Sequence, residues 1–117
     1  MDLRVRLGVS DARVLAALQA MESNIEAPLG RAELADIADL SLRQLERAFR
    51  RDLGCGVHEH YLRLRLDRAR QLLRESTLSV LDVAVATGFG SATQFSRAFR
   101  RVVGFPPKDV AKREGLA

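Results

Sequence analysis

The chain has 117 residues, of which 47% are apolar; this composition suits one compact folded unit and excludes an intrinsically disordered chain. Its net charge is +4, and no apolar run approaches the roughly 18 residues of a membrane span. The single cysteine, Cys55, excludes an internal disulfide and fits a reducing cytoplasm.

The positive charge lies in the later part of the chain. Residues 1–42 carry four arginines against seven acidic residues, whereas residues 43–117 carry 15 basic against eight acidic residues. Arginine outnumbers lysine 17 to 2, and a guanidinium group donates two parallel hydrogen bonds to phosphate or guanine. This composition favours a nucleic-acid partner, although basic domains also bind acidic proteins and lipids.

The first predicted helix follows an extended segment. Residues 1–9 alternate apolar and polar side chains, and we interpret them as a linker remnant. Apolar residues then recur at helical spacing, and either Ser10 or Asp11 is a suitable N-cap. The pattern predicts a helix that ends near Asn24.

A helix-turn-helix is predicted over residues 31–53. Gly30 stands at the N-cap of its first helix, which runs to Ala38, and Ser41 with Gln44 forms a capping box at the start of its second. Gly54 ends the second helix. The predicted core positions are Leu34, Ala35, Ile37, Leu45, Ala48, Phe49 and Leu53.

A long linker helix is predicted over residues 57–75. Its apolar stripe comprises Tyr61, Leu62, Leu66, Ala69, Leu72 and Leu73. Its remaining surface carries Arg63, Arg65, Arg68, Arg70 and Arg74. These arginines form a solvated helix face or, alternatively, contact DNA.

The second half of the chain repeats the first. Residues 41–51 recur as residues 91–101 at an offset of 50, and each copy reaches a glycine three positions later, Gly54 and Gly104. Two copies are too few for a solenoid but suit two DNA-reading helices. The whole of residues 10–117 is therefore predicted as a double helix-turn-helix domain.

The second helix-turn-helix is predicted over residues 79–103. Ser79 with Asp82 caps its first helix, and Ser91 with Gln94 forms a second capping box. A short last helix begins at Pro106 and frays after residue 112. The predicted fold class is all-α, with seven helices and no strand.

The second helix of a helix-turn-helix enters the major groove. Arg43 and Arg47 can donate to guanine, Glu46 can accept from cytosine, and Ala92 or Thr93 can contact a thymine methyl group. Arg97 is the strongest base reader of the second copy. The candidate base-reading residues are Arg43, Glu46, Arg47, Ala92, Thr93, Ser96 and Arg97.

Phosphate contacts are predicted at the helix starts and further along each helix, because free N–H groups and arginines bind anions. The candidate residues are Ser41, Gln44, Arg50, Arg51, Ser91, Gln94, Arg100 and Arg101. Six to eight contacts correspond to a salt slope of roughly −5 to −7. Alternatively, Gln44 and Gln94 act only as caps, and Arg47 and Arg97 form surface ion pairs.

The sequence shows no catalytic constellation. His58 and His60 are two positions apart and diverge on a helix, so we expect two surface residues and no zinc site. No nucleophile–base set or phosphate-binding loop stands out. We therefore expect no enzyme activity, no catalytic or metal site and no cofactor.

Residues 11–110 resemble the C-terminal DNA-binding domain of the AraC/XylS family of bacterial transcription regulators. The residues that carry the resemblance are Leu34, Ala35, residues 41–49, residues 61–73, Val83, Ala84, residues 88–91, residues 95–101, Gly104, Pro106 and Pro107. Residues 4–8 and 61–73 are most similar to the GlxA-like branch, whose members carry an amidotransferase-like sensor domain. These 117 residues lack that domain, and we interpret the chain as part of a longer regulator; the alternative is a stand-alone regulator.

The resemblance implies seven helices, two reading helices in successive major grooves and activation through RNA polymerase. Gly56 and Val57 stand where the family usually has Ser-Pro, so we expect a looser start of the linker helix. Val110 replaces a common aromatic residue, which predicts a weak last helix. Gly30 replaces the usual Ser cap.

The predicted function is sequence-specific binding of double-stranded DNA by a cytoplasmic transcription regulator. The alternative is a protein-interaction module that binds an acidic partner such as an RNA polymerase sigma factor. We expect the isolated domain to be monomeric, because the apolar pattern leaves no stripe over for a dimer interface.

Overall fold

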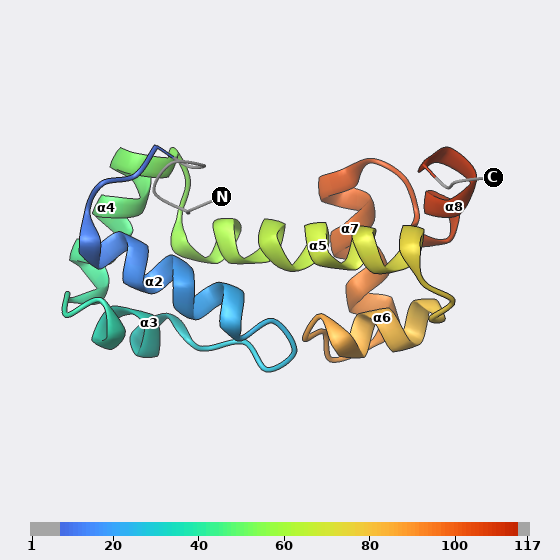
Figure 1. Ribbon diagram of the computed structural model, residues 1–117, viewed down its shortest axis with the longest axis horizontal. Coiled ribbons are helices and arrows are strands. Elements are labelled where there is room, and N and C mark those ends of the chain that lie inside the picture. Colours follow the sequence, from blue (N-terminus) through green and yellow to red (C-terminus); the bar gives the residue numbers. More distant parts are fainter. Residues whose placement is uncertain (1–7, 115–117) are drawn as a thin grey trace. The chain divides into compact units, whose positions relative to one another are not determined.

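The computed structural model describes residues 8–114, which form seven α-helices and one 3-10 turn and contain no strand (Figure 1). The predicted all-α fold is therefore confirmed. The interpretation of residues 1–9 as a linker lies almost wholly outside the described residues. The elements are α2 (Ala12–Ser23), α3 (Arg31–Ile37), α4 (Leu42–Leu53), α5 (Val57–Glu75), α6 (Val80–Ala86), α7 (Ala92–Val103), η1 (Pro107–Asp109) and α8 (Val110–Glu114).

The chain divides into two compact units, rather than the single compact unit that its length and composition predict. The first contains Pro28–Leu62 and the residues up to Asn24, and the second contains Ile25–Ala27 and the residues from Arg63 onward. Each unit holds one helix-turn-helix, α3 with α4 and α6 with α7. Among the described residues, no helix combines the length and the apolar character needed to cross a bilayer.

In the first unit, α2 packs against α3 and α4, and α3 packs against α4 (Figure 1). Asp11 is the N-cap of α2, since its side chain accepts from the N–H of Arg13. Each large apolar side chain of the core contributes about 1.5–3 kcal/mol by burial. The fully buried side chains include Val14, Met21, Leu34, Leu45, Phe49 and Val57.

Tyr61 fixes the segment between α2 and α3. Its hydroxyl donates to the carbonyl oxygen of Asn24 and accepts from the N–H of Leu29 at 3.1 Å. The ring is 5% exposed, so both hydrogen bonds lie at the edge of the core. They tie a segment that has no secondary structure to the N-terminal part of α5.

The prediction that Ile37 is buried is wrong, because its side chain is 47% exposed. On α3, Leu34 and Ala35 face the core and are 0% and 3% exposed. Ile37 lies about 200° further round the helix axis than Ala35, which turns it toward solvent. Ala38, directly after the helix, takes the remaining core position at 2%.

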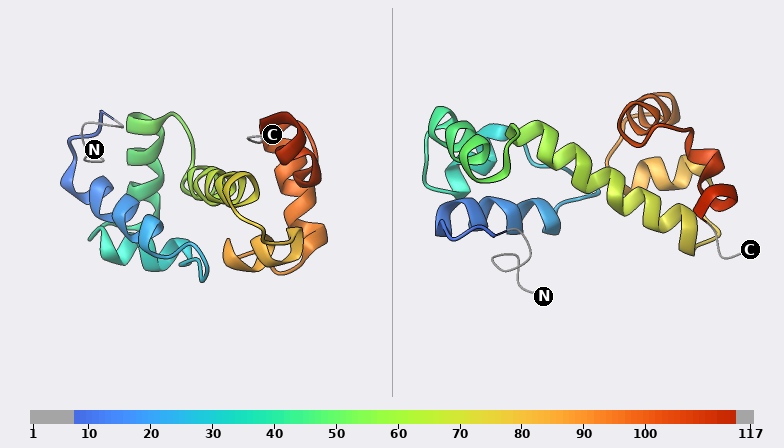
Figure 2. Two further views of the ribbon diagram at one scale, coloured as in Figure 1. Left: turned by 45° about the vertical axis from the view of Figure 1, so that its right-hand side comes forward. Right: turned by 90° about the horizontal axis from the view of Figure 1, so that it is seen from above.

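In the second unit, α6 packs against α7 (Figure 2). The η1 turn packs against α7 and α8. The ring of Phe95 lies between those of Phe89 and Phe99, with centroids 5.2 and 5.6 Å away. Val110 is fully buried and α8 continues to Glu114. The last helix is therefore anchored, rather than frayed after residue 112.

The described residues of α6 and the segment before it carry an apolar stripe that the sequence analysis missed. Leu81 and Val85 are each 56% exposed, and Leu78 is 43% exposed. Leu81 and Val85 are four positions apart, so they share one face of α6. The premise on which the monomer was predicted, that no apolar stripe is left over, is therefore wrong.

The two helix-turn-helix units end their first helices in the same way. The N–H of Leu40 donates to the carbonyl of Ala35, and the N–H of Phe89 donates to that of Ala84. The residue before each donor has a positive φ, 57° at Asp39 and 83° at Gly88. This hydrogen bond and the left-handed residue together are typical of a Schellman motif.

The second helices begin differently. Ser41 and Gln44 form the full capping box: the Ser41 Oγ accepts from the Gln44 N–H at 3.1 Å, and the Gln44 side chain accepts from the Ser41 N–H at 2.9 Å. At α7, within the part of the chain that the structure describes, only the bond from the Gln94 N–H to the Ser91 Oγ is formed. The second predicted capping box is therefore half-formed.

Candidate nucleic-acid interface

The exposed face of α4 carries arginines. Leu45, Ala48 and Phe49 are buried, which turns Arg43 and Arg47 to solvent. Neither arginine makes a hydrogen bond or ion pair to another described residue. Arg47 borders a small hollow together with Arg13, Leu40, Gln44, Ala48 and Arg51. Its guanidinium group is thus both exposed and uncommitted to any described partner.

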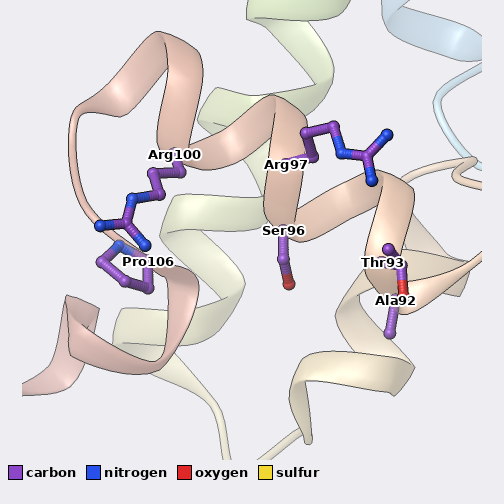
Figure 3. A pocket seen from close by; sticks show the side chains of 6 residues that line it. All are labelled: Ala92, Thr93, Ser96, Arg97, Arg100 and Pro106. Carbon is purple, nitrogen blue, oxygen red and sulfur yellow. The ribbon is translucent and has the colours of Figure 1, made fainter.

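The corresponding face of α7 borders a shallow hollow of about 490 Å³ (Figure 3). Thr93 and Arg97 are exposed, while Ala92 and Ser96 are half-buried. Arg97 makes no hydrogen bond or ion pair within residues 8–114. The residues around the hollow are Ala92, Thr93, Ser96, Arg97, Arg100 and Pro106, which include all four predicted base readers of this helix.

The two faces differ in net charge. Helix α4 contains four arginines and two acidic residues, whereas α7 contains three arginines and no acidic residue. Arg50 and Arg100 occupy corresponding positions, and both are exposed. Both helices are therefore positively charged, and the positive charge of α7 is not offset by acidic residues of its own.

Glu46, predicted to accept a hydrogen bond from cytosine, has partners inside the protein. Its Oε2 lies 3.4 Å from the backbone nitrogen of Val57, which donates to it. Its Oε1 lies 3.9 Å from Nη1 of Arg31. The side chain is 24% exposed, so Glu46 differs from its neighbours Arg43 and Arg47 on the same helix.

Arg51 and Arg101 have the same place in the repeat but different surroundings. Arg51 donates to Asp52 at 2.7 and 3.0 Å and to Asp11 at 3.1 Å. Hydrogen bonds from Arg13 and, to a smaller extent, Arg51 lower the pKa of Asp11 from 3.8 to about 2. Arg51 likewise lowers the pKa of Asp52. Arg101 is exposed and has no ion pair with a described residue.

The sequence predicts that Arg65 is either solvated or in contact with DNA, but its side chain is bound within the protein. Its Nε and Nη2 donate to the carbonyl oxygens of Thr87 and Gly88, both at 2.8 Å. Its guanidinium carbon lies 4.2 Å from the centre of the Phe89 ring. Arg65 therefore binds the turn that leads into α7, and the arginine-rich sequence of the helix contains no signal that singles it out.

Arg70 is also bound within the protein. It donates to both carboxylate oxygens of Glu114, with Nε at 2.7 and 2.9 Å. This hydrogen bonding lowers the pKa of Glu114 and raises that of Arg70. The pair joins α5 to α8, so Arg70 is a structural residue of the second unit.

The two histidines do not behave alike. His58 is exposed, as predicted, but His60 is half-buried, and its ring meets that of Phe49 edge-on at 5.8 Å. The prediction of a surface position is therefore wrong for His60. Among residues 8–114, no group of three or more His, Cys, Asp or Glu side chains is arranged to hold a metal ion.

Two helix-turn-helix units, each with exposed arginines on its second helix, define a DNA-binding protein of the helix-turn-helix class. The sequence profile of a family described as "Helix-turn-helix domain" matches residues 34–113. The chain is 41% identical over 113 residues to the "HTH-type transcriptional regulator GbdR" of Pseudomonas aeruginosa. The aligned region covers 97% of this chain. It spans 30% of the length of that relative.

Solved structures agree with the sequence match. A transcriptional regulator of Chromobacterium violaceum, described as AraC-type, has a TM-score of 0.84 and 37% identity over 91% of this chain and 96% of that one. The DNA-binding domain of AdpA, solved in complex with a target DNA, has a TM-score of 0.80 and 28% identity over 92% and 100%. The chain belongs to the AraC family of helix-turn-helix, DNA-binding transcription regulators.

Proposed function

We propose that each unit reads base pairs with the second helix of its helix-turn-helix, α4 in one and α7 in the other. The observation that carries this proposal is the equivalence of Arg47 and Arg97. Both stand at the same place in the repeat, both are exposed, and neither is bound to another described residue. An arginine in this state can donate both its hydrogen bonds to guanine O6 and N7.

The remaining base contacts come from neighbours on the same faces. Arg43 is the second reader on α4. On α7, Ala92 and Thr93 offer methyl groups to thymine, and Ser96 offers a hydroxyl group. The position of these α7 side chains around one hollow with Arg97 supports their acting together.

Contacts with the DNA phosphate backbone position each helix in its groove. Ser41 and Ser91 begin the reading helices, where the helix dipole favours phosphate, and Gln44 and Gln94 lie one turn further on. Arginines further along each helix provide additional phosphate contacts. We propose Arg50, Arg100 and Arg101 as the main phosphate-binding arginines, with a smaller contribution from Arg51 because it is already paired.

Selection of duplexes from a random pool at moderate salt tests the proposal. We expect two enriched blocks about one helical turn, roughly 10 base pairs, apart. A single block would mean that α7 only grips the backbone. Binding without any enrichment, which simply weakens as salt rises, would contradict sequence reading and favour an acidic protein partner instead.

We also propose that the protein acts in the bacterial cytoplasm and activates transcription through contact with RNA polymerase. Membership of a family of transcription regulators supports this proposal. The predicted monomeric state of the chain stays a proposal, and the exposed apolar stripe of Leu81 and Val85 on α6 argues against it. Sedimentation equilibrium tests that state, and a dimer that Leu81→Lys dissociates would contradict it and identify the exposed stripe on α6 as the interface.

A further inference from the structure

The N-cap residue of α5 is a glycine. The helix begins at Val57, and its first backbone hydrogen bond runs from the N–H of His60 to the carbonyl of Gly56 at 3.1 Å. Gly56 therefore holds the N-cap position but has no side chain to accept from the free N–H groups of the first turn. Val57 is fully buried, so its N–H needs an acceptor from the protein.

The acceptor comes from the neighbouring helix. Glu46 Oε2 lies 3.4 Å from the nitrogen of Val57, and Oε1 faces Arg31 Nη1 at 3.9 Å. A carboxylate at a helix N-terminus is favoured both by hydrogen bonding and by the helix dipole. To reach a base, this carboxylate would have to leave the Val57 N–H without an acceptor.

Gly56 leaves the space that this arrangement needs. A Cβ atom at residue 56 would lie 3.2 Å from Glu46 Oε2 and 3.6 Å from Arg50 Nη2. The first distance is shorter than ordinary van der Waals contact, so the carboxylate would have to shift. The absence of a side chain at Gly56 and the inward turn of Glu46 are thus two parts of one arrangement.

We propose that Glu46 is a positioning residue, which caps α5 from α4 and thereby fixes the reading helix to the helix that follows it, and that it does not read a cytosine. The proposal rests on α4 being a reading helix. It separates Glu46 from Arg43 and Arg47, which lie on the same helix and remain base readers. It also explains why α5 starts in an ordered way although Gly56 offers no cap.

The test uses the full chain and three variants. In Glu46→Ala we expect amide exchange at His60 to become about fivefold faster, as for the loss of an N-cap. The double variant Glu46→Ala/Gly56→Ser places a hydroxyl at the N-cap, where the nearest remaining neighbour, Arg50 Nη2, is at an ordinary contact distance. We expect it to restore slow exchange. Asp36→Ala, an exposed acidic residue on α3, is the control for lost charge.

Duplex selection provides the second readout. We expect Glu46→Ala to select the same bases as the parent chain, with weaker binding that the double variant recovers. Unchanged exchange at His60 together with loss of one cytosine preference would overturn the proposal. If the parent chain selects no sequence at all, the proposed reading function fails, while the exchange measurement still decides the capping role.

Discussion

The guanidinium carbon of Arg65 lies 4.2 Å from the centre of the Phe89 ring. The same group donates to the two carbonyl oxygens that precede this ring, those of Thr87 and Gly88. Carbonyl groups at the end of a helix have no partner within it, and a cation there also meets the negative end of the dipole. Arg65 therefore stabilises the turn that precedes α7 and sets the direction of that helix.

Replacement of Arg65 should destabilise the second unit. We expect Arg65→Ala to lower the free energy of unfolding by about 2 kcal/mol, from two charge-assisted hydrogen bonds and one cation–π contact. Arg65→Lys should recover only part of the loss, because it keeps the positive charge but its ammonium group cannot donate two parallel hydrogen bonds. Urea titration measures both. Arg68→Ala, on the same helix and exposed, is the control, and an equal loss there would refute the role of Arg65.

Loss of a base-reading arginine should weaken specific binding. We expect Arg47→Ala and Arg97→Ala each to cost about 1–3 kcal/mol on the selected duplex and to relax the preference at one base pair. Fluorescence anisotropy with matched and single-mismatch duplexes measures both effects. A loss below about 0.3 kcal/mol for both variants would remove these residues from the base-reading set.

The equivalent arginines Arg51 and Arg101 should differ in their dependence on salt. Arg101→Ala should reduce the slope of log K against log salt by about 0.9, the value for one phosphate contact. Arg51→Ala should reduce it by less, because Asp11 and Asp52 already neutralise that guanidinium group. Affinities measured from 50 to 300 mM salt would give both slopes. Equal slopes would mean that Arg51 leaves its acidic partners on DNA.

The carboxylate of Asp11 should contribute to stability in a defined acid range. Its pKa falls from 3.8 to about 2 on folding, so its contribution is fully present above pH 3.8 and is lost as the pH falls toward 2. Asp11→Asn keeps an acceptor for the helix cap but removes the charge. We expect the variant to show a smaller loss of urea midpoint between pH 4 and 2 than the parent chain; an identical loss would assign the effect to Asp52 or Glu114.

Local signals in the sequence predicted most of the fold. The repeat, the glycines and the serine caps placed both helix-turn-helix units, because these signals act within one turn of a helix. Burial at Leu45 and Phe49 followed from the helical period. Whether a long polar side chain turns inward depends instead on how two helices cross, and a local sequence pattern does not encode that crossing. For that reason the sequence predicts surface positions for Glu46 and Arg65, although both bind backbone groups of another segment.

The first helices of the two repeats correspond at an offset of 49, as Ala35 and Ala84 do, whereas the second helices correspond at 50. The second turn therefore contains one additional residue, Gly90, and Ser91 after it has a φ of −157°, against −68° at Ser41. The two reading helices thus leave their turns along different backbone paths. We therefore expect that grafting the exposed side chains of α7 onto α4 will not transfer the base preference proposed for α7, and that a working chimera must exchange the turn as well.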